Sequence, residues 1–192
     1  MDIIVEHLSK SYNNLQVLRD FSFRFPEKKT TCILGESGCG KTTLLHIILG
    51  IEKADAGKVS GVPYGRLSAV FQEDRLCENL SAEANIRLVG KGRIGEAQIR
   101  DTMEAVRLSE AFHKPVRELS GGMRRRVAVV RALLADAECI VMDEPLKGLD
   151  EETKAAVLRV IKEYTEGKTL IVVTHDKEEP RLFGAAALLE MP

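Results

Sequence analysis

Gly35-Glu36-Ser37-Gly38-Cys39-Gly40-Lys41-Thr42 is the stretch that decides the fold of this chain. It follows an apolar run at 30–34 that is predicted to be a buried strand, and it opens a helical pattern at 41–49. The spacing G-x-x-x-x-G-K-S/T is matched in full, in the strand, loop and helix setting that a phosphate-binding loop requires. A chance glycine-rich turn is the alternative, and the presence of all three parts favours phosphate binding.

The chemistry of this loop explains its residue types. Glycines let the backbone wrap closely around a phosphate group, because no Cβ stands in the way. Successive N–H groups and the helix N-terminus then present partial positive charge to the anion. Lys41 would reach the β- and γ-phosphates of a nucleotide, and Thr42 would place its hydroxyl on Mg²⁺. The candidate nucleotide-binding residues of the loop are Gly35, Glu36, Ser37, Gly38, Cys39, Gly40, Lys41, Thr42 and Thr43.

The rest of the chain alternates short apolar runs with longer helical patterns, which is typical of a parallel sheet covered by helices. Further strands are predicted at 67–71, 138–142 and 169–173. Helix formers dominate between Glu73 and Asp136, with helical patterns near 81–89, 95–113 and 121–135. The sequence therefore predicts one α/β domain over 1–192, with a core from 1–72 and 136–192 and an inserted helical subdomain at 73–135.

Two carboxylates stand where the strand at 138–142 ends. A strand buried on both faces delivers Asp143 and Glu144 to its C-terminal edge, beside the phosphate-binding loop. Asp143 would hold Mg²⁺, and Glu144 would act as general base on the attacking water. A strand that ends in a solvated acidic turn is common, so the assignment depends on the phosphate-binding loop being present too.

A second anion-binding element begins at Ser120-Gly121-Gly122, at the start of the helical pattern 121–135. A helix N-terminus led by serine and two glycines can receive a phosphate group. The alternative is an ordinary serine N-cap, and Ser120 can serve both purposes. Two phosphate cradles in one chain suggest that a nucleotide is shared between subunits.

The resemblance is to the ATP-binding-cassette ATPases, and it is carried by Gly35–Thr42, Leu119–Met123 and Asp143–Glu144, in this order along the chain. It covers essentially the whole chain. It implies a P-loop NTPase with a RecA-like, mostly parallel sheet and an inserted helical subdomain. It also gives roles to four other residues, each of which could instead be structural. Gln72 would contact Mg²⁺ or the water, His175 the γ-phosphate, Tyr12 the adenine ring, and Asp150 the dimer interface.

The resemblance implies ATP and Mg²⁺ as cofactors and a head-to-tail dimer of two copies. It also implies a transmembrane permease partner, which would hold the chain at the cytoplasmic face of the cell membrane. The segment Phe71-Gln72-Glu73-Asp74-Arg75-Leu76 resembles importers of nitrate, sulfonate and taurine. A soluble cassette ATPase without a permease is the second class. A P-loop kinase or GTPase is the third, and the second phosphate cradle argues against it.

Composition limits the partners further. The formal net charge is −1, which gives no reason to expect nucleic acid as a partner. No run approaches the roughly 18 apolar residues of a membrane span, so we expect another chain to cross the membrane. The four cysteines form no C-x-x-C pair, which favours a reduced, cytosolic setting. Cys39 stands at a position that the loop motif leaves free, which favours a small tolerated residue; the alternative is a thiol that the electropositive loop makes easier to oxidise.

The sequence departs from the family at two places near the predicted site. Arg125 stands where many importers have glutamine, and Leu146-Lys147-Gly148 replaces an aromatic residue followed by two small ones. We expect the phosphate cradle to survive the first change. The second puts the detail of the interface loop in doubt.

Overall fold

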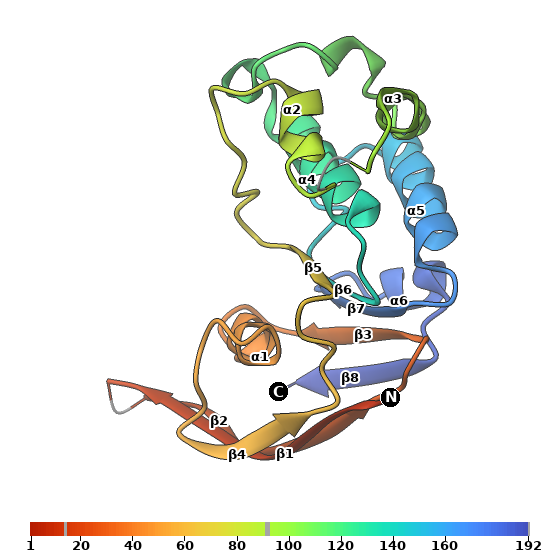
Figure 1. The fold of residues 1–192 in the computed structure, drawn as a ribbon. Coiled ribbons are helices and arrows are strands. Elements are labelled where there is room, and N and C mark those ends of the chain that lie inside the picture. The colour runs from red at the N-terminus through yellow and green to blue at the C-terminus, as the bar shows by residue number, and fades with distance from the viewer. Residues whose placement is uncertain (14, 91–92, 192) are drawn as a thin grey trace.

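The computed structural model describes residues 1–13, 15–90 and 93–191, and it contains two β-sheets (Figure 1). The larger sheet is parallel throughout, in the order β5-β6-β7-β3-β8. Its strands are β3 (Thr30–Gly35), β5 (Leu67–Val70), β6 (Cys139–Asp143), β7 (Thr169–Thr174) and β8 (Ala187–Met191). The smaller, antiparallel sheet has the order β2-β1-β4 and consists of β1 (Ile3–Tyr12), β2 (Leu15–Phe25) and β4 (Ala56–Ser60).

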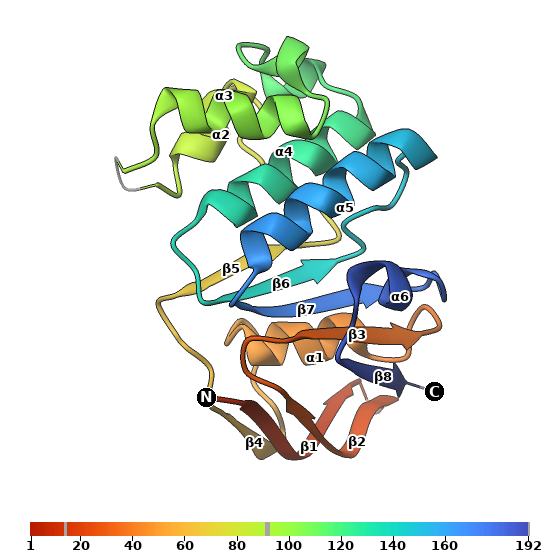
Figure 2. The ribbon, with the colours of Figure 1, turned by 90° about the vertical axis from the view of Figure 1, so that its right-hand side faces the viewer.

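Helices cover both faces of the parallel sheet (Figure 2). Helix α1 lies between the two sheets, while α4 and α5 cover the opposite face and α2 and α3 lie outside α4. The helices are α1 (Lys41–Ile48), α2 (Ala82–Arg87), α3 (Glu96–Ala105), α4 (Gly121–Leu134), α5 (Glu151–Thr165) and α6 (Glu179–Phe183), with 3-10 turns at Ser109–Ala111 and Val116–Glu118. In the described part of the chain, no helix is both long and apolar enough to cross a bilayer.

The central strands follow from their composition. Every residue of β6 and of β7 is buried, because helices cover one face of these strands and α1 with the antiparallel sheet covers the other. Strands buried on both faces read as continuous apolar runs rather than as alternating patterns. This is why both strands could be predicted from the sequence to within one residue at each end.

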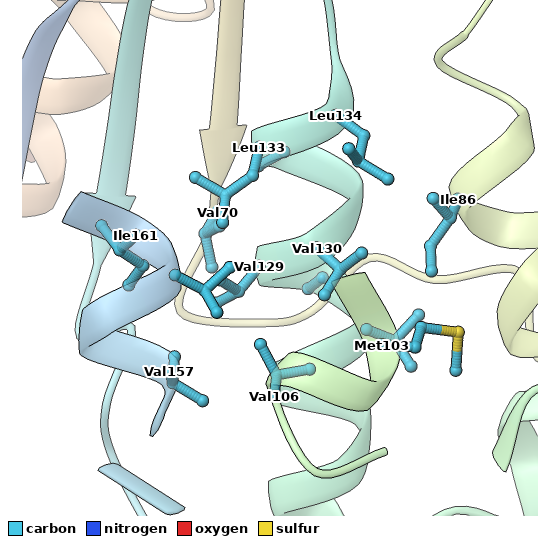
Figure 3. Packing of buried hydrophobic residues seen from close by; sticks show 14 of the residues in the cluster. Val70, Ile86, Met103, Val106, Val129, Val130, Leu133, Leu134, Val157 and Ile161 are labelled. Carbon is cyan, nitrogen blue, oxygen red and sulfur yellow. The ribbon is translucent and has the colours of Figure 1, made fainter. Parts of the chain in front are cut away.

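Two hydrophobic clusters, one on each face of the parallel sheet, hold these layers together. Figure 3 shows the helical cluster, in which Val129 and Leu133 of α4 meet Val70 of β5. Val157 and Ile161 of α5 complete this contact from the side. Leu133 is fully buried, so Leu133→Ala would cost about 2–5 kcal/mol of stability. The packing fixes the orientation of α4, which begins at the predicted second phosphate cradle.

The predicted α/β class with a parallel sheet is confirmed. The helices α2, α3 and α4 lie between β5 and β6, in the segment where the sequence predicts a helical subdomain. The division into core and subdomain stays a prediction, because α4 packs in one cluster with β5 and α5. The bounds of β8 and of the three antiparallel strands were not predicted from the sequence.

Candidate active site

The phosphate-binding loop connects β3 to α1, as predicted. Gly40 precedes α1 with φ 101°, and Gly38 has φ 90°, values that L side chains rarely adopt. A Cβ at Gly40 would lie only 2.9 Å from Cγ1 of Val17. Glycine is therefore required at this position by both the backbone angle and the close neighbour.

Lys41 is buried inside this loop. Its Nζ donates hydrogen bonds to the carbonyl oxygens of Gly35 (2.8 Å) and Glu36 (2.5 Å), and it lies 3.6 Å from Sγ of Cys39. The ammonium group thus sits among the acceptors that the loop itself provides. A bound phosphate group would offer it a charged partner in place of neutral carbonyl oxygens.

Asp143 joins the loop to the end of β6. Its Oδ2 accepts a hydrogen bond from Oγ1 of Thr42 at 3.0 Å, across a separation of 101 residues in the sequence. The Asp143 residue is only 5% exposed, and this burial raises the pKa of its carboxyl, although the Thr42 hydrogen bond opposes the rise. The two residues expected to hold Mg²⁺ are therefore brought into contact by the fold.

Glu144 has a constrained position at the same strand end. Its φ is 49°, which is unusual for a residue other than glycine and marks local strain, and its N–H donates to the carbonyl of Val173 at 2.9 Å. One carboxylate oxygen lies 2.9 Å from Nδ1 of His175, and the other forms an ion pair with Lys147. Burial would raise the pKa of Glu144, but the hydrogen bonds from Lys147 and His175 outweigh it and hold the pKa below its usual value.

One pocket of about 260 Å³ gathers most of the predicted residues. It is lined by Tyr12, Val17, Ser37, Gly38, Gly40, Lys41, Thr42, Thr43, Gln72, Asp143 and Glu144. Tyr12 is 41% exposed, and Nζ of Lys10 lies 5.1 Å from the centroid of its ring. Val17 is a lining residue that the sequence patterns did not indicate.

The oxygen donors of this pocket fit a magnesium ion. Thr42, Asp143 and Gln72 offer a hydroxyl, a carboxylate and an amide oxygen, which are hard donors of the kind that Mg²⁺ prefers. Within the described residues, no group of three or more acidic, histidine or cysteine side chains could hold a metal alone. A magnesium ion here would therefore depend on nucleotide phosphates and water for its remaining ligands, as is usual for Mg²⁺.

The second cradle lies apart from this pocket. Ser120 caps α4, with its Oγ accepting a hydrogen bond from the Met123 N–H at 3.3 Å. Residues 120–122 do not line the pocket, and neither does Asp150, which caps α5 by accepting from the Thr153 N–H at 2.9 Å. His175 also lies outside the pocket and reaches it through Glu144.

Comparison with known proteins agrees with this geometry. Residues 18–147 match the protein family described as ABC transporter. The aliphatic sulfonates import ATP-binding protein SsuB of Bacillus cereus (strain ATCC 10987 / NRS 248) is 35% identical over 93% of this chain and 75% of its own length. The sulfate/thiosulfate import ATP-binding protein CysA of Neisseria meningitidis (strain Z2491) is 32% identical over 93% of this chain. The chain spans 56% of the length of CysA.

A solved structure of the same kind superposes on the whole fold. The bacterial ABC transporter cassette MJ0796, solved as a dimer, has a TM-score of 0.85 and 27% identity over 98% of this chain and 94% of its own length. This chain belongs to the ABC transporter family and has the fold of an ABC transporter cassette. The matched relatives favour the transport class over the soluble cassette class that the sequence had left open.

Proposed function

We propose that this chain hydrolyses Mg·ATP at the pocket between the phosphate-binding loop and the end of β6. The observation that carries the proposal is the 3.0 Å contact between Thr42 and Asp143. This contact places the loop that would hold phosphates directly beside two adjacent carboxylates. Glu144 lines the same pocket, so a water molecule near the terminal phosphate would lie within its reach.

Each residue of the pocket would have a separate role in nucleotide binding or hydrolysis. Lys41 would neutralise charge on the β- and γ-phosphates, and Tyr12 would stack on the adenine ring. Thr42, Asp143 and Gln72 would hold Mg²⁺, which when bound neutralises charge on the phosphate oxygens. Glu144 would accept a proton from the attacking water while the oxygen of that water forms a bond to the γ-phosphorus. The bond from that phosphorus to the β-bridging oxygen breaks, leaving ADP and phosphate.

Each ATP would be shared between two copies of the chain. Ser120 and Gly121 are exposed, Gly122 is half-buried, and none of the three lines the pocket of its own chain, so this segment would be accessible to a second copy. MJ0796, which has a similar fold, was solved as a dimer. In a head-to-tail pair, Ser120 and Gly122 of one copy would close over the nucleotide held by Lys41 of the other, with Asp150 at the interface. His175 would turn from Glu144 to the γ-phosphate.

The dimer would power import of a small anion through a separate membrane-spanning permease. Support comes from the relatives SsuB and CysA, whose names describe import of sulfonates and of sulfate or thiosulfate. Residues 73–135 would form the helical subdomain that receives the permease, on the cytoplasmic face of the membrane. Transport would follow from closing and reopening of the pair.

The proposal is tested with Glu144→Gln, which removes the base and keeps the size of the side chain. With Mg·ATP, this variant should elute as a dimer in size-exclusion chromatography with light scattering. Lys41→Ala, which lacks the phosphate-binding ammonium, should stay monomeric under the same conditions. A Glu144→Gln chain that binds ATP but remains monomeric at high concentration would contradict the shared site.

A further inference from the structure

A single guanidinium group on α4 touches the main chain of two expected Mg²⁺ ligands. Arg125 is 7% exposed, and its Nη1 donates to the carbonyl oxygen of Phe71 at 2.6 Å while its Nη2 donates to that of Gln72 at 2.6 Å. Nη1 also reaches the carbonyl oxygen of Asp143 at 3.5 Å. Its Nε lies 3.2 Å from Oδ1 of Asp74.

The hydrogen bonds of Arg125 fix the relative positions of its acceptors. A buried guanidinium is unfavourable unless its donors find acceptors, and a planar fork holds those acceptors at fixed relative positions. Here the acceptors belong to two separate segments, the one that carries Gln72 and the end of β6 that carries Asp143. The side chain of Arg125 therefore sets the distance between these two segments.

Gln72 is the expected ligand that most needs such a restraint. Thr42 belongs to α1 and Asp143 belongs to β6, so regular backbone hydrogen bonds hold both. Gln72 lies beyond the end of β5, outside any helix or strand. Magnesium accepts little deviation from octahedral geometry, so a small displacement of this segment would weaken the site.

We propose that Arg125 is a positioning residue for the Mg²⁺ site, holding Gln72 at a fixed distance from Asp143. This inference rests on the proposed function, because it takes both residues as Mg²⁺ ligands. It also links the site to α4, which begins at the Ser120 cradle. A movement of α4 on binding the second copy's nucleotide would therefore be transmitted to Gln72.

The test measures nucleotide binding rather than activity alone. A fluorescent, non-hydrolysable ATP analogue is titrated into the wild-type chain and into Arg125→Met, with Mg²⁺ and with EDTA. Loss of a group that orients a metal ligand typically costs 10–100-fold in metal affinity. We expect Arg125→Met to bind the analogue in EDTA within about twofold of the wild type, and to lose about 10-fold or more of the Mg²⁺-dependent gain.

Three further variants separate positioning from folding. Arg125→Lys keeps the charge but cannot span the same acceptors, so it should recover only part of the gain. Asp74→Asn leaves the guanidinium in place without its ion pair, and should show a smaller loss in the same direction. Arg131→Met is the matched control, because Arg131 donates to the carbonyls of Asp74 and Arg75 on the same segment and has no hydrogen bond with Gln72 among the described residues. It should keep the full Mg²⁺ dependence.

Two results would overturn the inference. One is an Arg125→Met chain whose Mg²⁺-dependent gain equals that of the wild type. The other is equal weakening with Mg²⁺ and with EDTA in Arg125→Met, Arg125→Lys and Arg131→Met, which would mean general damage to the fold. A wild-type chain without any Mg²⁺-dependent gain would instead refute the proposed function, and with it the premise of this inference.

Discussion

Replacing Asp143 with asparagine should make the free chain more stable and the Mg·ATP complex less so. The carboxylate of Asp143 is buried, and its hydrogen bond with Thr42 comes from a neutral hydroxyl. An asparagine side chain keeps an oxygen for that hydrogen bond but carries no charge. The substitution therefore removes the unfavourable burial of charge and preserves the contact that organises the loop.

The size of both effects can be worked out. Substitutions that relieve one unfavourable feature typically stabilise by about 0.5–2 kcal/mol. For a domain of this size, about 1 kcal/mol corresponds to roughly 2–4 °C in Tm. A ligand at 100 times its Kd stabilises the folded state by about 2.7 kcal/mol, and Asp143→Asn should forfeit the Mg²⁺-dependent part of that gain.

The assay is thermal unfolding of both chains, without ligand, with ATP and EDTA, and with Mg·ATP. Without ligand, Asp143→Asn should have a higher Tm than the wild type. With Mg·ATP, it should have a lower Tm than the wild type. Because burial raises the pKa of Asp143 in the folded state, folding favours the neutral carboxyl over the carboxylate. The wild-type chain is therefore most stable below the unfolded pKa of this group, and it loses stability as the pH rises through the folded pKa. The advantage of the variant should accordingly shrink as the pH falls toward about 3.9. A variant that is less stable without ligand, or that gains as much from Mg·ATP, would refute this reasoning.

Three other predictions concern the surroundings of the site. Ser120→Ala removes the N-cap of α4 and should cost about 1 kcal/mol in denaturant unfolding, whereas an unchanged midpoint would mean that the cap contributes nothing. Lys147→Met removes an ammonium that lowers the pKa of Glu144, so this pKa should rise and the acid limb of the pH–activity profile should move to higher pH. A shift of the acid limb to lower pH would contradict the ion pair. Burial raises the pKa of Cys32 and Cys139 to about 12. A thiol reagent at pH 8 should therefore react first with Cys39 and Cys77, and with the two buried cysteines only after unfolding. Equally fast reaction of all four cysteines would contradict the packing.

The sequence was informative wherever structure and chemistry are local. Three features could be recognised from a few consecutive residues each: the phosphate-binding loop, the strand that ends in Asp143 and the serine that caps α4. The parallel sheet followed from apolar runs that need no alternation, because both faces are covered. In contrast, the hairpin of β1 and β2 alternates irregularly between exposed and buried positions and has several bulges, so its period-two pattern was obscured.

Other parts of the site depend on contacts between distant residues. Arg125 appeared in the sequence only as a departure from glutamine, and its partner Gln72 is 53 positions away. Lys147 was likewise noted as an unusual residue, but its ion pair with Glu144 depends on how the turn after β6 folds back. Such contacts leave no periodic or motif signal in a single sequence, because they arise only when the elements pack together.

The central claim is that one ATP is held by the phosphate-binding loop of one copy and the Ser120 cradle of another. Mixing two inactive variants tests it directly. Lys41→Ala disables the loop, and Gly122→Asp places a negative charge in the cradle, where a Cβ would meet only ordinary contacts at 3.4 and 3.5 Å. A mixed head-to-tail pair contains one site built entirely from unaltered parts. The account predicts that mixing equal amounts restores about a quarter of wild-type ATP hydrolysis, whereas a mixture as inactive as its components would contradict the shared site.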